Sequence, residues 1–358
     1  MTPGFSSAEL SERTSSATIS GIYHNPINAP HKLLEFIFIK LAPNNQLNIR
    51  LASALMAVVI VFCFYKLAVN WFGKAIGLFG TLLFISVPLY IVSARQGTAE
   101  IMYFSPIILI WLFAWLCKTK KSKSFAWLSF LAACGLVVYT PGLIWWLIGS
   151  FIVCRKRLIN TIDSVPTWLS AAGGALLLVI ISPLIISGAS HLSIFKQVLL
   201  IPASWPAPLV LLKQVGWMAM ALFLKTPYHN PLILGRVALV NALMLALVVF
   251  GVYAMQIAAR AKAIWLGLSI AFGILAAGLN NSLALLALSL PALAIFASAG
   301  LRYLYIEWRS IFPRNPVPKG FALILIAAVV ASQTYFGIRY ALAAWPQASQ
   351  TRQTYMIK

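Results

Sequence analysis

The residues best placed for chemistry are Arg95 and Glu100, which lie in a polar turn between two long apolar runs. The turn, residues 91–103, reads IVSARQGTAEIMY, and Glu100 is one of only six acidic residues in the chain. Ionisable groups at the edge of a bilayer are costly to desolvate, so they usually have a partner or a function. We interpret this turn as the rim of a membrane-embedded active site.

Both residues also fit simpler roles. Glu100 can act as an N-terminal carboxylate of the next helix, because Thr98 precedes it and an apolar run follows. Arg95 can anchor the chain by extending its charged head to the interface. The residue types alone leave both alternatives open.

Four further residues are candidates for binding or catalysis. Glu9 is an acid in the first polar segment, where it is either catalytic or a solvated loop charge. His24 and His31 flank the turn-rich stretch HNPINAPH, where packing roles compete with acceptor or metal binding. Lys196 can meet a phosphate or a lipid headgroup. The histidines lack a helical His-x-x-x-His spacing, so we predict no metal site, although a divalent metal stays an open alternative.

The composition indicates a polytopic α-helical membrane protein. Of the 358 residues, 61% are hydrophobic and only 9% are charged. Many apolar runs reach the roughly 17–25 residues that cross a bilayer as a helix. The net charge of +21 does not indicate nucleic-acid binding, because the basic residues are dispersed in short loops. The four cysteines have no CxxC spacing and suit packing.

The chain divides into a first loop, a membrane domain and a tail. Residues 1–49 form the longest polar stretch, without the pattern of a signal peptide. Within it, residues 32–41 (KLLEFIFIKL) place three charges on one face and suit an interfacial helix. We expect about ten spans in residues 50–338, among them residues 74–94, 236–257 and 263–279, and a shorter helix over residues 143–154. Residues 189–235 are expected to form an external or re-entrant segment. Residues 339–358 form a polar external tail.

Charge distribution predicts the orientation. Basic loops at residues 66–74, 118–123, 155–157, 260–262 and 302–319 are placed inside by the positive-inside rule. Both termini then lie outside, so either the first helix inserts with its N-terminus out or a helix precedes this sequence. The acidic residues separate accordingly, with Glu9, Glu12, Glu35 and Glu100 outside and Asp163 and Glu307 inside.

The layout resembles a known class of enzymes. A long first loop with an acid near its start is followed by an interfacial helix and by a turn of the form S-x-R-x-x-x-x-E. Residues 50–95 and the later stretch FPRNP, residues 312–316, add to the likeness. Together they resemble the polyprenyl-phosphate-sugar-dependent glycosyltransferases of the GT-C fold, closest to the protein O-mannosyltransferase and aminoarabinose-transferase group (glycosyltransferase family 39-like).

The resemblance implies a reaction and roles. Such enzymes transfer a sugar from a polyprenyl-phosphate carrier to a hydroxyl acceptor at the outer face of the bacterial cytoplasmic membrane. Glu9 matches the second acid of a first-loop Asp-Glu pair, but Ala8 stands where the Asp is expected. Glu100 falls at the second-loop acid. Arg95 falls where a basic residue can face the lipid phosphate, and His24, His31 and Lys196 are further candidates for binding it.

Two other functions remain open on the sequence. A transporter or lipid flippase would show internal repeats and midplane polar residues, and we see no repeat. A pseudoenzyme would keep the fold and bind carrier lipid without turnover, and Ala8 favours this alternative. The identity of the sugar, the carrier and the acceptor does not follow from the sequence.

Overall fold

The computed structural model describes residues 4–41, 47–119, 122–202, 204–226, 232–234, 236–311 and 316–355. Helices dominate these ranges, and no strand longer than an isolated bridge occurs in them. Residues 312–315 of the FPRNP stretch lie outside them. The chain forms two compact units: unit 1 comprises Met1–Ser7, Phe64–Ser93 and Pro206–Lys358, and unit 2 comprises Ala8–Cys63 and Ala94–Trp205.

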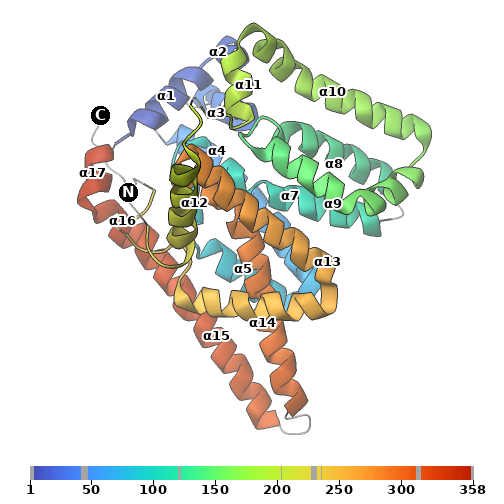
Figure 1. Cartoon of the computed structure of the whole chain (residues 1–358), viewed down its shortest axis with the longest axis vertical. Coiled ribbons are helices and arrows are strands. Elements are labelled where there is room, and N and C mark those ends of the chain that lie inside the picture. Colours follow the sequence, from blue (N-terminus) through green and yellow to red (C-terminus); the bar gives the residue numbers. More distant parts are fainter. Residues whose placement is uncertain are drawn as a thin grey trace. The chain divides into compact units, whose positions relative to one another are not determined.

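Unit 2 combines short helices at its N-terminal end with longer apolar helices. Its elements are α1 (Ser7–Ser16), α2 (Ile19–His24), α3 (Ala29–Leu41), the first part of α4 (Asn48–Phe72), the 3-10 helix η1 (Ala99–Phe104), α7 (Pro106–Lys118), α8 (Lys123–Val137), α9 (Leu143–Asp163), α10 (Thr167–Ser190) and α11 (Leu192–Val198). Figure 1 shows α7, α8 and α10 side by side, as their contacts confirm. Glycines permit the close approach of α8 and α10, since a Cβ on Gly173 would lie 2.4 Å from Leu131 Cδ1.

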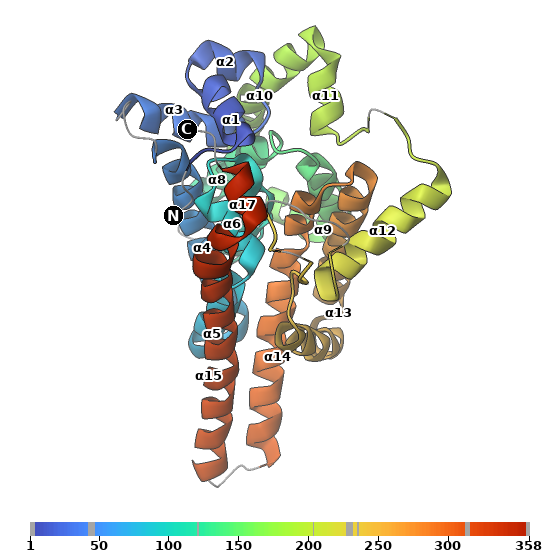
Figure 2. The same cartoon turned by 90° about the vertical axis from the view of Figure 1, so that its left-hand side faces the viewer.

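Unit 1 is built around one buried helix, α14 (Leu290–Ile311). The other elements are the end of α4, α5 (Lys74–Ile85), α6 (Pro88–Arg95, whose last two residues belong to unit 2), α12 (Pro208–Phe223), α13 (Ala242–Asn280), η2 (Leu283–Leu288), α15 (Pro316–Ile338), the π-helical η3 (Arg339–Ala344), α16 (Trp345–Gln347) and α17 (Ser349–Thr354). Every residue of α14 up to Leu301 is buried. Figure 2 shows α14 and α15 side by side.

Small residues explain how α14 packs so closely. A Cβ on Gly300 would lie 2.0 Å from the carbonyl oxygen of Leu247 on α13, and one on Gly251 would lie 1.8 Å from that of Phe296. The two backbones therefore touch where both helices have glycine. Small residues at helix contacts are typical of membrane bundles, in which close van der Waals packing drives association.

Two predicted helices differ from the simple expectation of straight spans. The apolar run at residues 74–94 is divided into α5 and α6, which meet at a bend of 66°. The bend precedes Pro88, which lacks an N–H and clashes with the preceding turn. The 39 residues of α13 contain a kink at Ala259, and this kink separates the two spans predicted at residues 236–257 and 263–279.

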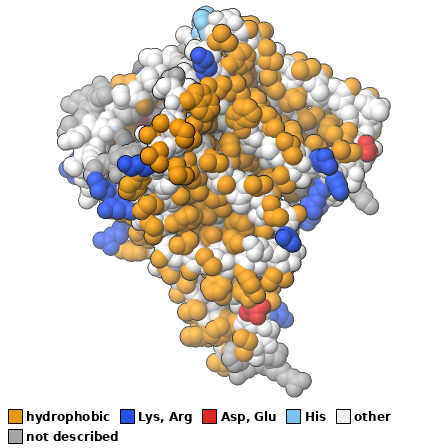
Figure 3. All heavy atoms as spheres, in the orientation of Figure 1, with side chains coloured by type: hydrophobic (Ala, Val, Ile, Leu, Met, Phe, Trp, Pro, Cys, Tyr) orange, Lys and Arg blue, Asp and Glu red, His pale blue; other side chains and the backbone are white. Residues whose placement is uncertain are grey.

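The described residues contain six helices long and apolar enough to cross a membrane, or seven if α5 and α6 count as one span. The predicted number of about ten is not confirmed. Part of the difference lies in α13, which is one helix in this number although two spans were predicted there. Its 39 residues correspond to roughly 58 Å at 1.5 Å per residue. Figure 3 shows hydrophobic side chains covering most of one face, with lysine and arginine side chains in separate places. The chain is an all-α, multi-pass membrane protein.

The C-terminal segment predicted as a polar tail is helical as far as Thr354. Tyr340, Trp345 and Tyr355 are buried in it, and the Tyr340 hydroxyl contacts the backbone N–H of Leu234. Residues 339–355 are thus part of the packing of unit 1. The predicted boundaries of the first loop, the membrane domain and the tail stay predictions.

Candidate functional site

Unit 2 brings together four of the six acidic residues of the chain. Glu9 and Glu12 lie on α1, Glu35 lies on α3 and Glu100 lies on η1. They are close enough for the charges of Glu9 and Glu12 to act on both Glu35 and Glu100. The two remaining acids, Asp163 and Glu307, are exposed near the ends of α9 and α14. The orientation predicted for the two groups of acids stays a prediction.

Glu9 is completely buried and both of its carboxylate oxygens accept hydrogen bonds. Arg50 donates from Nε to Oε1 at 3.0 Å and from Nη2 to Oε2 at 3.1 Å, and the backbone N–H of Gly97 donates to Oε1 at 2.8 Å. Gly97 is required here, because a Cβ would lie 2.5 Å from Ile49 Cγ2. Glu9 thus ties α1 to the start of α4 and to the turn before η1.

Glu100 lies at the start of η1 and is half-buried. The Thr98 hydroxyl donates to its Oε2, so Thr98 holds the carboxylate instead of capping the backbone of η1. Arg95 is the last residue of α6 and is also half-buried. The turn predicted as the rim of a site therefore contains an oriented carboxylate, while the roles of Glu100 and Arg95 stay predictions.

Two of the three charged residues of α3 are turned into the protein, whereas the third, Lys40, is exposed. Lys32 is 2% exposed and Glu35 is fully buried, whereas Leu33, Ile37 and Leu41, four residues apart, are exposed on the same helix. Lys32 Nζ donates to the carbonyl oxygen of Asn25 at 2.9 Å. An outer face that is largely apolar suits a helix lying at a membrane surface, while Lys32 and Glu35 lie inside the protein.

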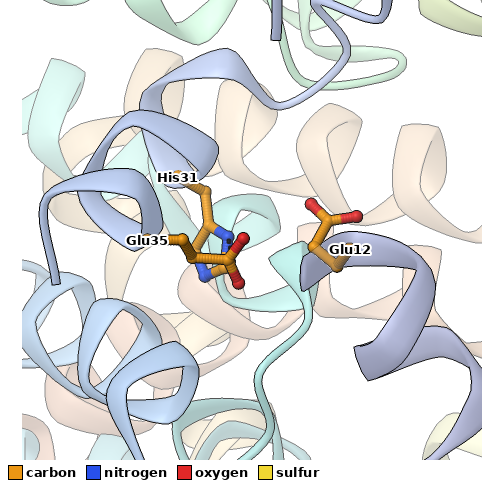
Figure 4. A group of neighbouring side chains, drawn as sticks. All are labelled: Glu12, His31 and Glu35. Atoms are coloured by element: carbon orange, nitrogen blue, oxygen red, sulfur yellow. Dashed lines mark ion pairs between the residues drawn. The ribbon is translucent and has the colours of Figure 1, made fainter. Parts of the chain in front are cut away.

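His31 and Glu35 occupy successive turns of α3, and Glu12 lies beside them on α1 (Figure 4). His31 Nδ1 lies 3.6 Å from Glu35 Oε1, which is too long for a hydrogen bond. One ligand atom from each of Glu12, His31 and Glu35 lies within 4.8 Å of the others. These three residues are therefore the group in the described chain that could hold a metal ion.

Burial shifts the pKa values of this group strongly. It raises the pKa of Glu35 to about 8, helped by the charge of Glu12 and opposed by the Ser16 hydroxyl and Lys32. It raises the pKa of Glu12, with Lys32 opposing. Burial, and secondly the charge of Lys32, lowers the pKa of His31 to about 4. His31 is therefore neutral at pH 7, and its contact with Glu35 is not an ion pair.

The other predicted binding residues lie apart from this group. His24 is exposed at the end of α2, with its ring edge-on to Tyr23 at 6.2 Å between centroids. Lys196 is exposed in the last turn of α11. The structure brings Glu9, Glu100 and His31 into one region of unit 2 and leaves His24 and Lys196 on its surface.

Sequence reasoning missed Glu12, Glu35 and Arg50 as members of the site. One signal was available, because the four-residue spacing of His31 and Glu35 places them on one helix face. The pairing of Arg50 with Glu9 joins residues 41 positions apart and has no local signature. Glu12 comes close to His31 and Glu35 because α1 packs near α3, and no local sequence pattern records this proximity.

Comparison with known proteins decides the fold class. Residues 31–186 match the family described as dolichyl-phosphate-mannose-protein mannosyltransferase. The structure is similar to ArnT from Cupriavidus metallidurans in the apo state, with a TM-score of 0.59 and 14% identity, over 96% of this chain and 72% of that chain. The chain has the GT-C fold. ArnT bound to undecaprenyl phosphate gives a TM-score of 0.58 at 14% identity, over 98% of this chain and 74% of that chain.

The GT-C resemblance predicted from the sequence is confirmed by these matches. The family match begins at His31 and includes Glu35, Arg50, Arg95 and Glu100, whereas α1 with Glu9 and Glu12 precedes it. No curated protein matches the sequence.

Proposed function

We propose that the chain is a membrane glycosyltransferase that takes a sugar from a polyprenyl-phosphate carrier and transfers it to a hydroxyl acceptor. The observation that carries this proposal is the GT-C fold over nearly the whole chain, shared with an ArnT structure bound to undecaprenyl phosphate. The family match over residues 31–186 supports it independently. The reaction takes place at the outer face of a bacterial cytoplasmic membrane, where the carrier keeps its tail in the lipid.

The acidic region of unit 2 supplies the chemistry in this proposal. Attack by a hydroxyl on an anomeric carbon needs a proton acceptor, and Glu100 is a half-buried carboxylate that can serve as one. Glu9 has both oxygens engaged by Arg50 and Gly97, so it acts by positioning α1. Arg95 binds the phosphate of the carrier, because a guanidinium offers two donors to an anionic oxygen pair. Lys196 and His24 are surface sites for the same headgroup.

A second candidate is a protein that binds the carrier without transferring sugar. The arrangement at α1 favours it, because Ala8 replaces the expected acid and Glu9 is held by three donors. This alternative keeps lipid binding and removes turnover, so the two functions predict different results in one experiment.

The experiment uses the purified full chain in lipid nanodiscs. Binding of undecaprenyl phosphate is compared with binding of undecaprenol, and sugar release is followed with undecaprenyl-phosphate-linked sugars. Preference for the phosphate together with sugar release supports the transferase. Phosphate preference without release for any donor supports the carrier-binding alternative. Equal binding of both lipids contradicts both functions.

A further inference from the structure

We propose that Glu12, His31 and Glu35 form a binding site for a divalent transition-metal ion of the Zn²⁺ or Mn²⁺ type. The sequence predicted no metal site and left a divalent metal as an open alternative. The site would hold an ion whether or not the chain transfers a sugar. Three buried atoms, Glu12 Oε1, His31 Nδ1 and Glu35 Oε1, have no hydrogen-bond partner. Buried polar atoms are normally satisfied, so three such atoms in one place call for a ligand.

The hydrogen bonds of His31 determine which ring nitrogen carries the proton. The Ser53 hydroxyl donates its only proton to the carbonyl oxygen of Thr98 at 3.1 Å. Ser53 Oγ, which lies 2.8 Å from His31 Nε2, must therefore accept from that nitrogen. In the neutral ring Nδ1 then has a free lone pair, and it faces Glu35. A histidine ligand is usually oriented in this way by a hydrogen bond to its other nitrogen.

The neighbouring polar groups leave two carboxylate oxygens of the cluster unsatisfied. The Ser16 hydroxyl contacts both Glu35 Oε2 and the carbonyl oxygen of Glu12, and it has one proton for two acceptors. The charge of Lys32 acts on both Glu12 and Glu35, but its Nζ donates to the carbonyl oxygen of Asn25. Glu12 Oε1 and Glu35 Oε1 are therefore left without a hydrogen-bond donor, and a divalent cation would bind both.

The donor set suits a transition metal better than calcium or magnesium. Nitrogen and carboxylate ligands bind Zn²⁺ at about 2.0–2.2 Å, and three protein ligands leave coordination positions open. The ligand atoms of Glu12, His31 and Glu35 lie within 4.8 Å of one another. Side-chain rotations that move each atom by about 1 Å would bring all three to those bond lengths from one ion. Glu12 is the half-buried member and gives the ion a route from outside.

The test measures metal binding directly. The full chain is purified, stripped with a chelator and dialysed against Zn²⁺ or Mn²⁺, and bound metal is counted by mass spectrometry. Co²⁺ gives a second readout through its visible absorption. The variants are Glu35→Gln and Glu12→Gln, with Glu307→Gln as the matched control, because Glu307 is an exposed acid on α14. Thermal melting of each variant establishes that it folds.

The proposal expects one ion per chain in the unsubstituted protein and in Glu307→Gln. It expects at least a tenfold loss of affinity in each site variant, since a ligand is lost. Glu12→Gln keeps the test decisive if the fully buried Glu35→Gln does not fold. No stoichiometric binding overturns the proposal, as does equal affinity in site and control variants.

Discussion

Glu9 and Arg50 form a two-point ion pair inside unit 2, with nitrogen–oxygen distances of 3.0 and 3.1 Å. The Glu9 side chain is fully buried, while that of Arg50 is 16% exposed. The pair joins α1 to α4, and Gly97 adds the turn before η1. It therefore fixes the position of the helix that presents Glu12 to α3.

Breaking this pair should destabilise the protein. Arg50→Ala leaves a buried carboxylate without its main partner, and we expect a loss of about 3 kcal/mol. Arg50→Lys should lose less, because it keeps the charge and one donor. A double-mutant cycle measures the interaction free energy between the two residues. It compares the denaturation in detergent of Arg50→Ala, Glu9→Gln and the double variant with that of the unsubstituted protein. Strict additivity of the two single changes would show that the residues do not stabilise each other.

Glycine contacts between α13 and α14 should tolerate no side chain. Gly251→Ala places a Cβ against the backbone of Phe296, which cannot rotate away, so we expect a loss of about 1–3 kcal/mol. Gly267→Ala on the same helix is the matched control, because nothing lies within 4 Å of its Cβ. The control should be neutral or gain up to about 1 kcal/mol from helix propensity. Similar melting temperatures for the two variants would contradict the packing seen at Gly251.

Orientation can be read from single cysteines in a cysteine-free background. Ser11 on α1 and Ser193 on α11 are exposed, as is Ser122 before α8. Cysteines at Ser11 and Ser193 should react with an impermeant thiol reagent in intact cells, whereas one at Ser122 should react only after lysis. Labelling of Ser122→Cys in intact cells would reverse the topology and place the acidic region inside.

Arg95 should act on the lipid phosphate and leave the fold intact. We expect Arg95→Ala to weaken undecaprenyl phosphate binding at least tenfold and to leave undecaprenol binding unchanged. Lys196→Ala, an exposed cation on α11, is the comparison and should have a smaller effect. If both lipids lose affinity equally, Arg95 contributes to packing rather than to phosphate recognition.

Most helices of this protein could be predicted from the sequence, because long apolar runs with basic ends have few alternatives in a membrane. The kink of α13 at Ala259 lies between two predicted spans, which were separated at the basic residues 260–262. The bend before Pro88 was missed, because the apolar composition continues through it while the helix axis changes direction. The length of α9, which extends past the basic residues 155–157 to Asp163, was also missed.

The site was only partly predictable. The polar turn with Glu100 could be singled out because charged residues are rare in this chain. The environments of Lys32 and Glu35 were not found, because a helical wheel shows which residues share a face and not whether that face meets water or protein. Glu12 and Arg50 entered the site through contacts between distant segments, which no local pattern records.

The most direct test of the central claim is sugar release from a lipid-linked donor by the purified chain and by Glu100→Gln. We expect the unsubstituted protein to release undecaprenyl phosphate from its donor. Glu100→Gln should fall at least a hundredfold in rate, a loss of the size that general base catalysis supplies. Glu307→Gln should keep the rate, and all three proteins should bind undecaprenyl phosphate equally. Unchanged release by Glu100→Gln would remove this residue from the mechanism, and no release from any donor by a protein that binds the lipid would contradict the transferase.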